Sequence, residues 1–305
     1  MIARTMLIVT DRRLLAAGER AAFHGRPADG IAPLQNYLQA SWPADPERGR
    51  AQWLLGVCMT AAGQFGSAAT QLQPLLALPV DAEPRTRHIA GAAACTLASI
   101  HRQVGKFAEA RAFDEWAAAV AASDPRVAFD AMLGAAADCV GVGDREGATE
   151  RVAQARAMCS ENPSWWRERI RLGWVQCEVA LILDRAAEAI PPLTRSVQEA
   201  EQVGAPRHVA KSLLFLAAAM HTVADPAALS VMGRAALLAE SLGAWPLVWA
   251  SRGTMVEWLR EADPEAAEHC RRSAEHAVRI MAADMPGELA TQWLARPDVV
   301  RLFGA

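Results

Sequence analysis

The sequence predicts an all-α protein made of about seven stacked antiparallel helix hairpins. Two observations favour this fold class. Alanine, leucine, arginine and glutamate dominate the 305 residues, which contain a single tyrosine, and this composition is typical of helices. In addition, a helix–turn–helix unit recurs every 38 to 42 residues, a period typical of stacked helical hairpins. Because each unit contacts only its neighbours, such an array builds one continuous core.

The clearest unit spans residues 97–117. One helix ends before a tight turn at Gly105, and a second helix begins at Phe107. The small residues Ala98 and Ala110 allow the two helices to approach closely, and the ring of Phe107 can fill the gap between them. Equivalent turns are expected at Gly25, Gly63, Gly143, Asp184, Ala224 and Ala262.

The same spacing places every helix of the array. The leading helices are expected at residues 11–24, 47–62, 85–104, 125–142, 163–183, 205–223 and 244–262. The trailing helices are expected at residues 29–41, 66–78, 107–122, 145–160, 186–202, 226–242 and 264–283. The chain therefore divides into an N-terminal lead-in (1–10), the repeat array (11–283) and C-terminal capping helices (284–305). A cap is needed because the last repeat has no neighbour to bury its apolar face.

Helix starts are marked by an acid or amide followed by proline. Five such pairs occur, at Asp45-Pro46, Asp124-Pro125, Asn162-Pro163, Asp225-Pro226 and Asp263-Pro264. The first side chain can accept hydrogen bonds from free N–H groups, and proline loses nothing at the first helical position. Pro191-Pro192 falls inside the fifth trailing helix and predicts a kink or a delayed start.

Composition argues against several classes of partner. The formal charge of −3 does not favour nucleic-acid binding, which needs a basic face. No apolar run reaches the roughly 18 residues that a membrane span requires. Six scattered cysteines without a CxxC pair are typical of reduced thiols in the cytoplasm. We expect a cytoplasmic protein with no direct nucleic-acid or membrane partner.

Two units carry a family pattern most clearly. Leu55-Gly56 is followed by Gly63-Gln64-Phe65 and Ala68, and Leu97-Ala98 by Gly105-Lys106-Phe107 and Ala110. With these positions, residues 11–283 resemble bacterial tetratricopeptide repeat proteins, although the period is longer than the usual 34 residues. The resemblance implies a right-handed superhelix that binds proteins or extended peptides in a concave groove lined by leading helices. Related α-solenoids are the alternative.

Aligning the repeats predicts which side chains face this groove. The candidate partner-binding residues are Arg50, Trp53, Arg102, Gln103, Arg171, Trp174, Glu178, Lys211, His221, Trp249 and Arg252. Further positions on the same face are Cys95, Ser99, Asp130 and Arg260. Basic residues recur at one equivalent position, at Arg50, Arg171 and Lys211, where they could bind carboxylates of an acidic peptide. The alternative is a solvated helix surface without a ligand.

Tryptophans are unusually frequent, with ten in the chain. Trp53, Trp174 and Trp249 are predicted on the groove side as anchors for a peptide, and the alternative is packing between repeats. Some relatives of the fold bind a C-terminal carboxylate with lysine and asparagine. Only Asn36 and Asn162 occur here, and neither is expected in the groove, so that site is not predicted.

The motifs of common enzymes do not occur in the sequence. His269 and His276 are seven residues apart and have no third ligand for a metal. We therefore expect a non-enzymatic interaction scaffold without a cofactor, which binds a partner protein or peptide. The alternative is a regulatory sensor that binds a small signal molecule or a transcription regulator. A homodimer formed through the convex side or the terminal helices is a further possibility.

Overall fold

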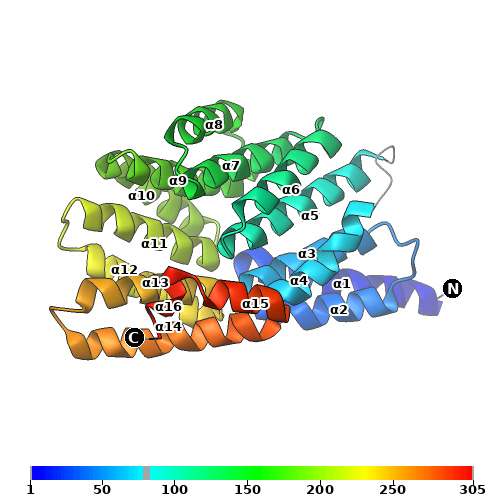
Figure 1. Cartoon of the computed structure of the whole chain (residues 1–305). Coiled ribbons are helices and arrows are strands. Elements are labelled where there is room, and N and C mark those ends of the chain that lie inside the picture. The colour runs from blue at the N-terminus through cyan, green and yellow to red at the C-terminus, as the bar shows by residue number, and fades with distance from the viewer. Residues whose placement is uncertain (1, 78–82, 304–305) are drawn as a thin grey trace.

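The computed structural model describes the backbone of residues 2–77 and 83–303, and the side chains of those ranges from Arg12 onward. The described residues form sixteen α-helices and three short 3-10 helices, arranged as antiparallel hairpins (Figure 1). The prediction of an all-α array is confirmed. None of the described helices is both long and apolar enough to cross a membrane.

Successive hairpins pair an odd-numbered helix with the even-numbered helix that follows it. The odd-numbered helices are α1 (Ile2–His24), α3 (Arg48–Ala61), α5 (Pro84–Gln103), α7 (Pro125–Gly141), α9 (Trp166–Ile182), α11 (Pro206–Thr222) and α13 (Trp245–Leu259). The even-numbered helices are α2 (Ile31–Ala40), α4 (Phe65–Leu72), α6 (Phe107–Val120), α8 (Arg145–Met158), α10 (Ala186–Gln202), α12 (Ala228–Leu242) and α14 (Pro264–Asp284). The chain ends with α15 (Gly287–Leu294) and α16 (Pro297–Val300), and the 3-10 helices are η1 (Pro27–Gly30), η2 (Gln73–Ala77) and η3 (Pro163–Trp165).

Most helix boundaries lie within a few residues of the predicted ones, with two differences. Residues 2–10, expected as a lead-in, belong to α1. The delayed start expected at Pro191-Pro192 is wrong, because α10 begins at Ala186 with both prolines inside it. They lie beyond the first turn, so the two hydrogen bonds that N–H groups at these positions would donate to the carbonyls of Ala187 and Glu188 are missing.

The turns that end the leading helices share one backbone conformation. Gly63, Gly105 and Gly143 have φ angles of 77° to 82°, and the predicted equivalents Asp184 and Ala224 have φ angles of 60° and 58°. The N–H of the following residue then bonds to the carbonyl five residues earlier, as Asp225 does to Met220 at 2.9 Å. This is the hydrogen bond that commonly closes a helix C-terminus. Gly25 and Ala262 do not adopt positive φ, so the turns at those positions are of another type.

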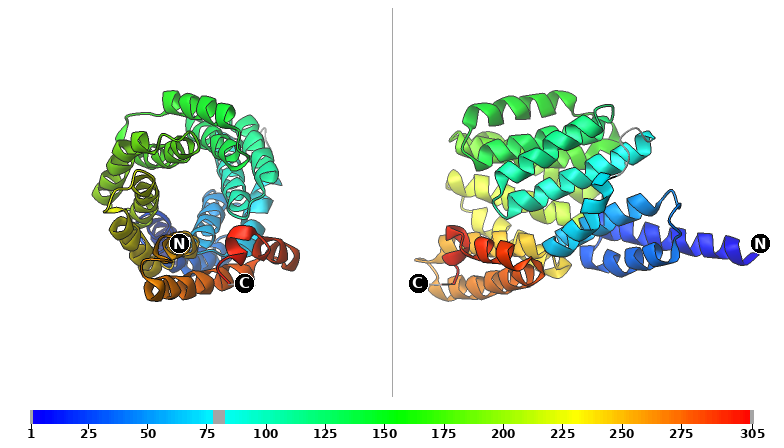
Figure 2. Two further views of the ribbon diagram at one scale, coloured as in Figure 1. Left: turned by 60° about the vertical axis from the view of Figure 1, so that its left-hand side comes forward. Right: turned by 45° about the vertical axis from the view of Figure 1, so that its right-hand side comes forward.

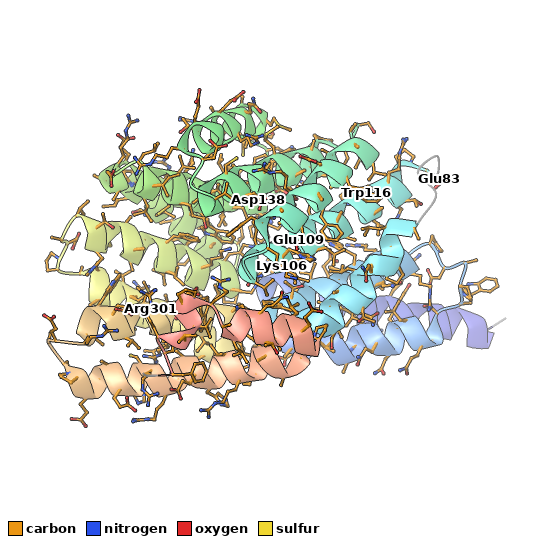
Figure 3. All side chains as sticks on the ribbon, viewed as in Figure 1. Glu83, Lys106, Glu109, Trp116, Asp138 and Arg301 are labelled. Atoms are coloured by element: carbon orange, nitrogen blue, oxygen red, sulfur yellow. The ribbon has the colours of Figure 1, made fainter. Side chains whose placement is uncertain are left out.

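The hairpins follow one another around a ring, and the last hairpin returns beside the first ones (Figure 2). The N–H of Ser67 donates to the Asp284 carboxylate at 2.9 Å, and the Ser67 hydroxyl donates to the same group at 2.5 Å. Nη1 of Arg296 donates to the carbonyl of Gln103 at 3.1 Å. We call these the closing contacts. Figure 3 labels Lys106, which lies three residues after Gln103 in the turn between α5 and α6.

The closing contacts accompany a shared hydrophobic core. One buried cluster extends from Leu15 to Val104 and from Ala217 to Leu302. Trp293 and Val299 of the C-terminal helices are fully buried in it. The capping helices therefore cover the first hairpins as well as the last one.

Ala224 provides a test of the turn geometry. An L residue in the left-handed region is strained by about 1–2 kcal/mol, and glycine relieves this strain while losing some conformational entropy. Ala224→Gly should therefore raise the free energy of unfolding by about 0.5–1 kcal/mol, measured by urea denaturation.

The matched control is Gly143→Ala, at an equivalent turn where an added Cβ would meet nothing within 4 Å. It should lower the free energy of unfolding through the backbone alone. A lower stability of Ala224→Gly would contradict the explanation.

Candidate binding site

Two groups of buried charges lie on neighbouring leading helices. In the first, Nη1 of Arg102 on α5 lies 2.6 Å from Asp114 of α6 and 3.2 Å from Asp138 of α7. Both carboxylates are almost fully buried, with side-chain exposures of 1% and 0%. Figure 3 labels Asp138 within the body of the molecule. Burial raises the pKa of Asp114 to about 7, although Arg102 partly offsets the effect, and Asp138 raises it further.

The second group has the opposite balance of charge. Asp130 of α7 accepts hydrogen bonds from Arg171 and from Arg167, the latter at 2.9 Å, both on α9. Burial alone would raise the pKa of Asp130, but the two guanidinium groups outweigh it and lower the pKa to about 2. Arg167 also lies 3.5 Å from the buried carboxylate of Glu168, which Arg126 approaches to 3.3 Å, so three guanidinium groups and two carboxylates meet here.

Aromatic rings pack beside this second group. Trp174 of α9 is buried, and its Nε1 donates to Ser212 of α11 at 2.8 Å. His208 stacks on Trp174 with ring centroids 5.6 Å apart. Nζ of Lys211 lies 4.5 Å from the centroid of Trp174 and 5.7 Å from that of Phe215, a geometry in which the ring faces attract a cation.

Lys211 and Arg207 of α11 complete the site. Burial lowers the pKa of Lys211 to about 8 and that of Arg207 to about 10. Nearby guanidinium groups lower both values further, while Glu178 partly offsets the shift of Lys211. Among the side chains that the structure describes, neither cation has a carboxylate within ion-pair distance. We define the cationic cluster as Arg167, Arg171, Arg207 and Lys211.

The cluster faces the inside of the ring. Arg102 of α5 contributes to the pKa shifts of both Lys211 on α11 and Glu178 on α9. Two further leading helices, α7 and α9, separate α5 from α11 along the array. The ribbon of these helices curves around a ring (Figure 2), so charges on α5 and α11 act on one another although two leading helices separate them along the chain.

The structure brings some of the predicted residues together and separates others. Arg171, Trp174, Glu178 and Lys211 lie side by side on α9 and α11, and Arg102 lies in the neighbouring acidic group. Arg50 does not join the expected row of basic groups, because it is paired with Glu19 of α1 and Glu47.

Trp53 packs between the first hairpins. Its Nε1 donates to the Thr96 hydroxyl at 3.2 Å, and its ring lies near Phe23 and His88. Gln103 folds back on its own helix, with Nε2 donating to the Ser99 carbonyl at 3.3 Å. Neither side chain contacts a member of the cationic cluster.

Near the C-terminus the predicted placements fail. Trp249 packs against Trp293 of the capping helices, with ring centroids 6.0 Å apart. Arg252 is only 7% exposed and forms two hydrogen bonds with Glu240 of α12. His221 stacks on Trp258 of α13 at 3.9 Å. The groove assignment of Trp249 and Arg252 is wrong, because these side chains pack within the array and against its cap.

Arg167, Arg207 and His208 were not predicted as site residues. A signal for the arginines does exist in the sequence. Arg167 and Arg171 are four residues apart on α9, and Arg207 and Lys211 repeat this pair 40 residues later on α11. Residues four apart share a helix face, so two adjacent repeats place four cations together.

The described residues offer no group of three or more His, Cys, Asp or Glu side chains that could hold a metal ion. A surface depression between α13 and α14, lined by Arg252, His269 and Arg272 among others, involves none of the cationic cluster. The cluster thus differs from a metal centre and is suited to an anionic partner.

Comparisons with known proteins find the fold but no family. No protein family matches the sequence, and no curated protein does. The chain is similar to the Rap conjugation gene regulator of the plasmid pLS20, solved in complex with the Phr* peptide. That match has a TM-score of 0.72 and 14% identity, and it covers 97% of this chain and 79% of the regulator.

A second similar structure is a Rap protein complexed with Competence and Sporulation Factor. Its TM-score is 0.56 at 11% identity, covering 98% of this chain and 80% of that protein. These identities show a shared fold only. The all-helical repeat architecture of this chain is therefore that of the Rap regulators.

The raised pKa of Asp114 predicts a pH-dependent stability. Its folded-state pKa of about 7, against 3.8 ordinarily, means that the folded protein binds this proton more tightly than the unfolded chain. This stabilising contribution is complete below pH ~4 and is lost as the pH rises to ~7. Asp114→Asn removes the titration. The unmodified protein should therefore lose stability relative to this variant as the pH rises from ~4 to ~7, and the difference should level off above that range.

Urea denaturation across this pH range measures the difference. The matched control is Asp29→Asn, at an exposed position in η1, which should show no comparable trend. A constant difference between Asp114→Asn and the unmodified protein would contradict the assignment.

Proposed function

We propose that this chain is a non-enzymatic cytoplasmic regulator that binds a peptide, or a peptide segment of a partner protein, on the inside of the ring. The observation that carries the proposal is the cationic cluster above the Trp174 and Phe215 rings. Cations drawn into the body of a protein normally have carboxylate partners, and the half-buried Arg207 and Lys211 have none within ion-pair distance among the described side chains.

The arrangement suits peptide recognition for a physical reason. Helices α9 and α11 are held by the ring on both sides, so the cations and rings are ordered before a ligand arrives. Such preorganisation reduces the entropy lost on binding. Aromatic and arginine side chains are also the residues that most often dominate binding energy at interfaces.

The similar structures support a peptide as the ligand. One was solved with the Phr* peptide and the other with Competence and Sporulation Factor. A small anionic signal molecule is the second candidate, because the same unneutralised cations would accept it. A metabolite that raises the melting temperature in a panel, without competition from peptides, would favour this second candidate.

Charge reversal tests the peptide proposal. The purified protein would be screened against a random library of short synthetic peptides, and binders would be measured by fluorescence anisotropy. Lys211→Glu should weaken these binders at least about tenfold, since one lost charged contact is equivalent to ~1.5–3 kcal/mol.

The control is Arg195→Glu, at an exposed position on the trailing helix α10, which should bind the same peptides as the unmodified protein does. Circular dichroism would verify that both variants are folded. Peptides that bind equally to Lys211→Glu and to the unmodified protein would show that the inside of α11 is not the site.

A further inference from the structure

Arg207 is the most unusual charged residue in the described part of the chain. Its Nε is buried and has no hydrogen-bond acceptor. The guanidinium groups of Arg167 and Arg171 lie close enough to act against its own positive charge. The residue as a whole is half-buried, but a buried donor atom without an acceptor requires an explanation.

Charged side chains and aromatic rings both lie close to this part of α11. His208, the next residue, is 1% exposed and lies between the rings of Trp166 and Trp174, with its Nδ1 also lacking a partner. Lys211 lies one helical turn further along α11. The charged groups on other helices that act on these two cations are Arg167, Arg171 and Glu178 of α9 and Arg102 of α5. The carboxylate of Asp130 is already occupied by two arginines.

Resting on the proposed function, we infer that Arg207 and Lys211 together bind a carboxylate group of the ligand. Arginine offers two parallel N–H donors that match the two oxygens of a carboxylate, and lysine adds a point charge. The adjacent rings of Trp174 and Phe215 exclude water from one side, which strengthens the charge-assisted bonds. This site uses an arginine and a lysine one turn apart on a single helix.

The carboxylate can come from an acidic side chain or from the C-terminus of a peptide, and paired peptides distinguish these sources. Each peptide selected from the library would be remade in two forms, with Asp and Glu replaced by Asn and Gln, or with an amidated C-terminus. One of the two changes should weaken binding to the unmodified protein by about 10- to 100-fold. The same change should have little effect on Arg207→Gln.

Arg207→Gln removes a half-buried charge that has no carboxylate partner and is repelled by other guanidinium groups, so it should be at least as stable as the unmodified protein, and lost binding would not reflect unfolding. Arg195→Gln is the matched control at an exposed position and should keep the full preference for the carboxylate. If Arg207→Gln and the unmodified protein prefer the carboxylate forms equally, or if neither protein prefers them, the inference is overturned while the proposed function stands.

If no peptide binds, the proposed function fails, and succinate then decides the inference. The melting temperature would be followed as succinate replaces chloride at constant ionic strength. A rise in the unmodified protein and in Arg195→Gln, absent in Arg207→Gln, would support a carboxylate site. Equal shifts in all three proteins would overturn it.

Discussion

The single residue at positive φ that ends a helix is the constraint on which the array depends. With one such residue, the N–H of the next residue reaches the carbonyl five positions earlier, and the chain reverses within a few residues. Five leading helices end this way, and Gly204 and Gly243 end two trailing helices in the same manner. Similar turns give the hairpins similar geometry, so that equivalent positions on successive helices face the same direction. The alignment of Arg167 with Arg207, and of Arg171 with Lys211, follows from this regularity.

Buried charges divide the inside of the ring into two parts. Around Arg102, two carboxylates share one guanidinium group, whereas around Asp130 two guanidinium groups share one carboxylate. Burial raises the pKa of Asp114 because Arg102 offsets it only in part, whereas two guanidinium groups outweigh burial at Asp130 and lower its pKa. The unpaired cations of α11 extend the second part. The first group therefore carries an excess of negative charge, and the second an excess of positive charge.

The helices could be predicted well because their signals are local. Asp124 and Asp263 cap α7 and α14 as expected, and Asp184 and Ala224 adopt the glycine-like conformation that the repeat alignment implied. The site could be predicted only in part. Repeat spacing identifies a common face, and it placed Arg171, Trp174, Glu178 and Lys211 together, as they lie in the structure; their role in binding stays a prediction. Trp249 packs against Trp293 of the capping helices, and Arg252 bonds to Glu240 of the adjacent α12, and the repeat spacing reports neither contact.

The contact between Ser67 and Asp284 joins residues separated by 217 positions in the sequence. In an open solenoid each repeat interacts only with its neighbours, and segments can unfold from either end. Here the two ends share a core, so fraying of the last helices also exposes apolar side chains of the first hairpins. Ring closure thus makes the unfolding of the repeats cooperative. It also has a kinetic consequence, because the longest loop must close before the shared core can form, and such non-local contacts slow folding.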